Sequence, residues 1–140
     1  MKNKTILTSL LFIALAATNC TKNTDKNIDV AAPSITVISP EIDQTFTTSW
    51  GGAWPEGEPV TLAAKGTDDM QVSSISITVT NTNGDIVFLK TTDNTSTNEL
   101  EFTINESYTA EDQDTYTVVF KALDASGNTA TSTPRTFIYK

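Results

Sequence analysis

The sequence contains no histidine, and its single cysteine is Cys20. Without histidine, the chain lacks the usual general base near neutral pH and the commonest ligand of transition metals. A lone cysteine has no partner for an internal disulfide bond. A serine nucleophile would need a base to activate it, and we find no residue placed to do so. We therefore expect a protein that is not an enzyme, with a small hydrolase as the less favoured alternative.

Basic residues are scarce. The chain has nine lysines and arginines against 17 aspartates and glutamates, which gives a formal charge of −8. A surface of this sign repels the phosphates of nucleic acids, so we expect no DNA or RNA partner. The same surface is compatible with a bound cation, a neutral glycan or a basic protein.

The chain has only one long apolar stretch, at residues 6–17, and Lys2 and Lys4 precede it. This stretch is shorter than the roughly 20 apolar residues that span a bilayer. A positive start followed by a short apolar run is typical of a secretory signal peptide, here residues 1–19. Removal of this segment also removes both lysines and leaves a formal charge of −10.

The segment that ends at Cys20 (residues 15–20, Leu-Ala-Ala-Thr-Asn-Cys) resembles the lipobox of bacterial lipoproteins. The resemblance implies cleavage before Cys20, lipid on its thiol and a polar tether over residues 20–33. Thr21 after the cysteine is similar to the signal for release to the outer membrane. We therefore expect a protein held on the outer membrane by its lipid, facing the periplasm or the cell surface. An ordinary signal peptide is the alternative.

Residues 34–140 show the alternation of apolar and polar side chains that is typical of β-strands. We predict seven strands, at residues 34–39, 59–65, 72–80, 86–92, 98–105, 114–124 and 131–139. Pro134 in the last of these predicts a sheet edge or a bulge. Seven short strands separated by turn-forming residues favour an all-β domain with two antiparallel sheets.

Residues 66–77 and 115–130 resemble the immunoglobulin-like and cadherin-like modules of bacterial surface proteins. The resemblance implies an immunoglobulin-like seven-strand sandwich that serves as a stalk, an adhesin or a glycan-binding module. It also implies that Tyr116 forms a tyrosine corner, in which the hydroxyl bonds back to the preceding backbone.

Acidic and amide residues gather in three predicted loops at one end of such a sandwich. They are Asp68, Asp69, Asp93, Asp124 and Asn128. Calcium takes six to eight oxygen ligands, which converging loops of this kind supply. In cadherin-like domains similar acidic loops bind calcium. The alternative is that these residues only form turns by bonding their own backbone.

Two tryptophans, Trp50 and Trp54, lie in the longest predicted loop. Exposed aromatic rings bind the faces of sugars or protein partners. They support a glycan-binding accessory lipoprotein of a polysaccharide-uptake system as an alternative function, unless the rings are buried in the core. Our main expectation is a lipoprotein with a binding or structural role that contacts envelope or surface proteins.

Overall fold

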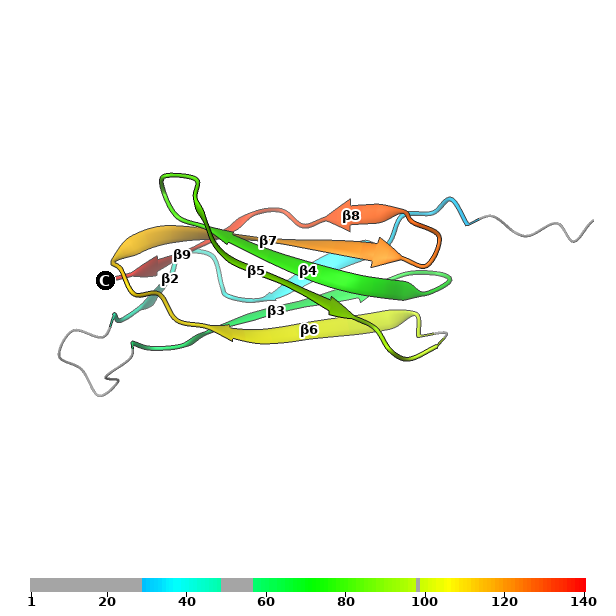
Figure 1. Cartoon of the computed structure of the whole chain (residues 1–140), viewed down its shortest axis with the longest axis horizontal. Helices are drawn as coiled ribbons and strands as arrows, with labels where there is room; N and C mark the ends of the chain where they lie inside the picture. Colours follow the sequence, from blue (N-terminus) through cyan, green and yellow to red (C-terminus); the bar gives the residue numbers. More distant parts are fainter. Residues whose placement is uncertain (1–28, 49–56, 98) are drawn as a thin grey trace, which may run out of the picture.

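The computed structural model describes residues 29–48, 57–97 and 99–140 (Figure 1). Nine β-strands and no helix occur in this part of the chain. The strands are β1 (Ser34–Ser39), β2 (Gln44–Phe46), β3 (Val60–Thr67), β4 (Val72–Thr80), β5 (Ile86–Asp93), β6 (Glu101–Tyr108), β7 (Asp114–Asp124), β8 (Thr129–Thr131) and β9 (Arg135–Tyr139). None of the described residues belongs to a helix that is long and apolar enough to span a membrane.

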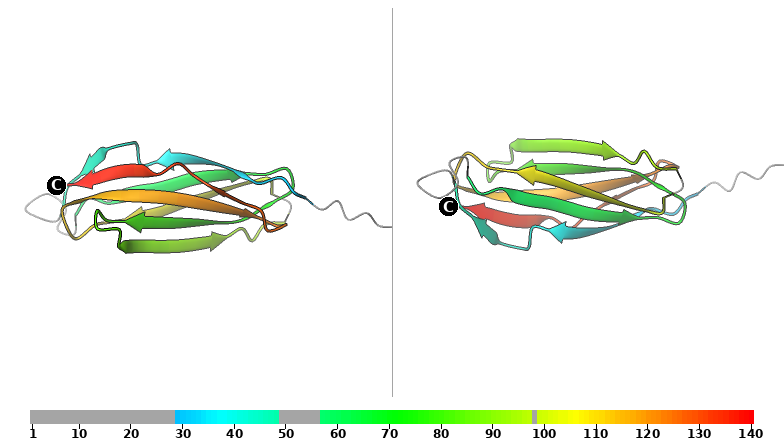
Figure 2. Two further views of the ribbon diagram at one scale, coloured as in Figure 1. Left: turned by 90° about the horizontal axis from the view of Figure 1, so that it is seen from above. Right: turned by 90° about the horizontal axis from the view of Figure 1, so that it is seen from below.

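The strands form two sheets that pack face to face (Figures 1 and 2). One sheet has the order β1-β3-β6, and the other has the order β2-β9-β7-β4-β5, with β8 also paired to β7. All neighbouring strands are antiparallel except β2 and β9, which are parallel. The prediction of an all-β, two-sheet sandwich is therefore confirmed.

The predicted count of seven strands is wrong for two reasons. The short strand β2 was not predicted, because three residues carry too little alternation to be recognised. The predicted strand over residues 131–139 is divided into β8 and β9. Pro134 lies in the break and has no N–H to donate to a ladder. At the break, the Ser132 hydroxyl accepts a hydrogen bond from Phe120 N (3.1 Å), which satisfies a buried donor that strand pairing leaves free.

The core lies between the sheets and follows the alternation in the sequence. Along β4, Ile75, Ile77 and Val79 have no exposed surface, while the residues between them are half-buried. The inward residues of β7 are Tyr116, Val118, Phe120 and Ala122. Burial of one such aliphatic or aromatic side chain contributes about 1.5–3 kcal/mol, so this shared apolar layer is the main source of stability.

Rings from both sheets pack together in the half of the core that lies toward the C-terminus. Tyr116 stacks on Phe137 with a centroid separation of 5.6 Å, and Tyr108 meets Tyr116 edge-on at 6.0 Å. The Tyr116 hydroxyl donates to the Asp112 carbonyl, four residues earlier, at 2.9 Å. The tyrosine corner expected at this position is therefore present.

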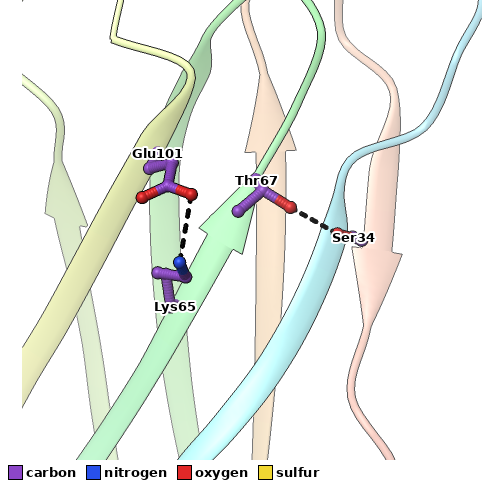
Figure 3. A network of polar contacts seen from close by, with 4 residues as sticks. All are labelled: Ser34, Lys65, Thr67 and Glu101. Carbon is purple, nitrogen blue, oxygen red and sulfur yellow. Dashed lines mark hydrogen bonds and ion pairs between the residues drawn. The ribbon is translucent and has the colours of Figure 1, made fainter.

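The outer face of the β1-β3-β6 sheet carries polar contacts between neighbouring strands (Figure 3). The hydroxyls of Ser34 and Thr67 lie 2.6 Å apart, and Lys65 Nζ lies 3.0 Å from a Glu101 carboxylate oxygen. These groups are exposed, and exposed ion pairs contribute at most about 1 kcal/mol. They favour this register of the strands more than they stabilise the fold.

Candidate calcium-binding site

Three carboxylates meet at the end of the sandwich where the chain enters the domain. Asp29 precedes β1, Asp68 follows β3, and Asp124 is the last residue of β7. One carboxylate oxygen from each lies within 4.8 Å of the others. Sequence-distant segments therefore place three formal negative charges within a space that one cation could bridge.

Asp124 is held rigidly, and its side chain is almost fully buried (2% exposed). Its Oδ1 accepts hydrogen bonds from Ser126 N and Asn128 N, both at 2.8 Å. Its Oδ2 accepts one from Asn128 Nδ2, also at 2.8 Å. Burial raises the pKa of Asp124, but these hydrogen bonds outweigh burial and hold the pKa below its usual value. The carboxylate is therefore ionised at neutral pH.

Asp68 and Asp29 each use one carboxylate oxygen and leave the other unsatisfied. Asp68 Oδ1 accepts from Met70 N (3.0 Å) and Gln71 N (3.1 Å), and Asp29 Oδ1 accepts from Ala31 N (2.9 Å). The Oδ2 atoms of both residues are buried, and no described residue donates a hydrogen bond to them. A buried acceptor without a partner costs about 1–3 kcal/mol. A cation between the carboxylates would satisfy both atoms.

The donor set fits calcium. All three residues offer hard carboxylate oxygens, and a calcium ion takes six to eight oxygens from carboxylates, carbonyls and water. Zinc prefers thiolate and imidazole ligands, and the sequence has no histidine and only one cysteine. Asp29, Asp68 and Asp124 would therefore hold the ion.

The structure brings together only part of the predicted ligand set. Asp68 and Asp124 lie in the cluster, and Asn128 adjoins it through Nδ2, which donates to Asp124 and, at 3.3 Å, to the Asp29 carbonyl. Asp69 and Asp93 are exposed and do not belong to the cluster. Asn128 thus orients a carboxylate through its amide nitrogen.

Sequence reasoning missed Asp29, because residues 20–33 were assigned to a tether. The only signal was its position, a few residues before Pro33 and the first strand. The other predicted functional residues, Cys20, Trp50 and Trp54, lie outside the described residues. Lipidation at Cys20 and glycan binding by the tryptophans remain predictions.

Comparisons with known proteins assign no function. No protein family and no curated protein matches the chain. Among solved structures, the chain is similar to an engineered protein, with 23% identity and a TM-score of 0.48 over 79% of this chain. The chain spans only about a fifth (20%) of the length of that protein.

Proposed function

We propose that this protein is a lipid-anchored, exported lipoprotein whose immunoglobulin-like domain binds one calcium ion and serves a non-enzymatic binding or structural role in the cell envelope. The observation that carries the calcium assignment is the pair of buried, unsatisfied Oδ2 atoms on Asp29 and Asp68 beside the ionised Asp124. Turn formation alone explains the Oδ1 bonds of these residues, but it leaves the Oδ2 atoms without a role.

The immunoglobulin-like type is supported by the sheet order and by the tyrosine corner at Tyr116. The β2–β9 parallel pair and the division of the last strand are local departures from a plain seven-strand arrangement. The lipid anchor is supported by the sequence pattern that ends at Cys20.

Calcium at this position would join the segment before β1 to the two loops that follow β3 and β7. Asp29 contributes from the segment before β1, whereas Asp68 and Asp124 are fixed by their neighbours. The ion would therefore fix the point at which the proposed tether meets the sandwich. We expect it to stabilise this end of the domain and to set the orientation of the domain relative to the membrane.

Isothermal titration of the protein with calcium tests the metal assignment. We expect one site for calcium, weaker binding of magnesium because it demands a smaller octahedral set of ligands, and loss of the site in Asp68→Asn. The matched control is Asp93→Asn, which removes an exposed aspartate outside the cluster and should bind calcium as the wild type does. Equal calcium binding by both variants would reject the site.

The anchor is tested separately by labelling cells with a radioactive fatty acid. We expect label on the wild-type protein and none on Cys20→Ser, which should appear in the soluble fraction. Cleavage of the domain by protease added to intact cells would indicate the cell surface, and protection until the outer membrane is opened would indicate the periplasm.

A further inference from the structure

A cavity lies at the end of the sandwich where β7 begins, opposite the end that holds Asp124. It has a volume of about 340 Å³ and lies where β5 begins, β6 ends and β7 begins. Its lining residues are Val87, Tyr108, Thr109, Glu111, Asp112 and Tyr116. The lining therefore combines two acidic residues with two tyrosines, a threonine and a valine.

Three polar side chains of this cavity, those of Tyr108, Glu111 and Asp112, form no ion pair or side-chain hydrogen bond within the described part of the chain. The described residues form two ion pairs, Lys65–Glu101 and Lys90–Glu106, and neither pair involves Glu111 or Asp112. The hydroxyls of Tyr116 and Tyr139 donate to backbone carbonyls, whereas the Tyr108 hydroxyl has no hydrogen-bond partner among the described residues. Two carboxylates and a free phenol match a cation that carries several N–H donors, such as guanidinium or ammonium.

An open strand edge begins at the same place. Among the strands that the structure describes, β5 is the last of its sheet and pairs only with β4. Beyond the strand, Asn94 N donates to Ser73 O at 2.8 Å, in the register that pairs Ser74 with Asp93. Because hydrogen-bonded pairs alternate in an antiparallel ladder, this bond fixes the phase of the strand from Phe88 to Asp93, and the register shifts before Phe88.

The phase determines which backbone groups of β5 are free. Lys90 and Thr92 direct their N–H and C=O groups at β4, and Leu89, Thr91 and Asp93 direct theirs at the open edge. Such a row of unpaired groups is a template for another strand.

The side chains along this edge are unusually apolar for an exposed strand. Ile86 is 62% exposed, Val87 40% and Leu89 65%. Val87 also lines the cavity, so the apolar edge and the acidic cavity form one continuous surface. Lys90, the basic residue of β5, lies 3.7 Å from Glu106 on β6, so its charge is balanced within the domain.

We propose that this surface binds an extended segment of another protein, which adds a strand along β5 and places a lysine or arginine side chain beside Glu111 and Asp112. Backbone hydrogen bonds would supply the affinity, and the acidic cavity would supply the specificity, as in other cases of strand addition. A second copy of this chain is the less suitable occupant, because the chain carries a formal charge of −8 and would bring like charges together.

Nuclear magnetic resonance titration of the labelled protein tests the proposal. The probes are two synthetic peptides of about eight alternating valines and threonines, one beginning and one ending with arginine, because a partner strand could run in either direction. Each has a matched peptide with glutamine in place of arginine. We expect an arginine peptide to shift the Leu89 and Thr91 amide signals and to slow their hydrogen exchange.

Two variants locate the binding. Replacing both carboxylates (Glu111→Gln with Asp112→Asn) should lower the affinity for the arginine peptide about tenfold or more. The matched control, Asp69→Asn with Glu99→Gln, removes two exposed carboxylates elsewhere and should bind as the wild type does. Thr91→Pro removes an edge-facing N–H and should abolish binding. If Thr91→Pro does not fold, the carboxylate variant decides the question.

Several results would overturn the proposal. The first is that neither arginine peptide changes the spectrum at about 1 mM. The second is that the glutamine peptides bind as tightly as the arginine peptides, or that the carboxylate variant binds as tightly as the wild type. The third is self-association through β5, detected by sedimentation. None of these would affect the calcium assignment, because the cavity lies where β7 begins and Asp124 lies where β7 ends.

Discussion

Replacing Asp68 by asparagine should change the stability of the protein in opposite directions with and without calcium. The asparagine oxygen can still accept the hydrogen bonds from Met70 N and Gln71 N, so the local turn is kept. In place of the unsatisfied Oδ2, the variant has an amide that can donate to Asp29 or Asp124. It also loses a negative charge from a group of three.

The magnitude follows from the separation of the charges. At 4.8 Å, two unit charges repel by about 3.5 kcal/mol at an effective dielectric constant of about 20, and by about 0.9 kcal/mol at that of water. Because Asp29 and Asp68 are half-buried, the lower part of this range applies. In a chelator we therefore expect Asp68→Asn to be about 1–2 kcal/mol more stable than the wild type, which raises the Tm by about 5 °C or more.

With calcium bound, the wild type should instead be more stable than Asp68→Asn. An ion at about 100 times its Kd stabilises the wild type by about 2.7 kcal/mol, and the variant should gain little. Thermal unfolding followed by circular dichroism, in chelator and then in calcium, measures both effects. Asp93→Asn should show the same calcium shift as the wild type. A variant that is less stable than the wild type in chelator, or that gains as much from calcium, would refute the reasoning.

Three further predictions concern pH and packing. In chelator, the free energy of unfolding should fall as the pH drops below about 4. The reason is that the pKa of Asp124 is lower in the folded protein than in the unfolded chain, and protonation removes its hydrogen bonds. In chemical unfolding, Asp124→Asn should therefore reduce this loss of stability at acid pH. Burial, followed by the neighbouring Tyr116 and Tyr139, raises the pKa of Tyr108 far above its usual 10.0. Stability should therefore fall as the pH rises above about 10, and Tyr108→Phe should reduce that loss; an unchanged alkaline limb would contradict this. Ile77→Ala should cost about 2–5 kcal/mol in urea unfolding because Ile77 is fully buried, whereas the same change at the 55% exposed Ile38 should cost within about 0.5 kcal/mol, and similar costs would argue against the described core.

Much of the sheet architecture could be predicted from side-chain alternation. The bounds of β1, β4 and β7 agree with the predicted ranges, because their residues alternate over many positions. The start of β6 lies later than expected, since Glu99 and Leu100 continue the alternation but do not enter the ladder. β2 pairs with β9 from about 90 residues away along the chain, and such pairing has no local signal.

The candidate site was predictable only in part, for a similar reason. Asp68 follows one predicted strand and Asp124 ends another, so their convergence follows from the expected topology. Asp29 reaches the site from a segment with no periodic pattern, and its place depends on contacts such as the one between Asn128 and its carbonyl. Asp93, in contrast, lies in the last position of β5, where pairing with Ser74 sets its place and its side chain stays exposed.

The calcium assignment is tested most directly by a crystal structure of the protein grown with calcium, with anomalous scattering used to identify the metal. We predict one calcium ion with oxygens of Asp29, Asp68 and Asp124 at about 2.3–2.6 Å. Carboxylates that instead meet only water or protein donors at saturating calcium would contradict the account.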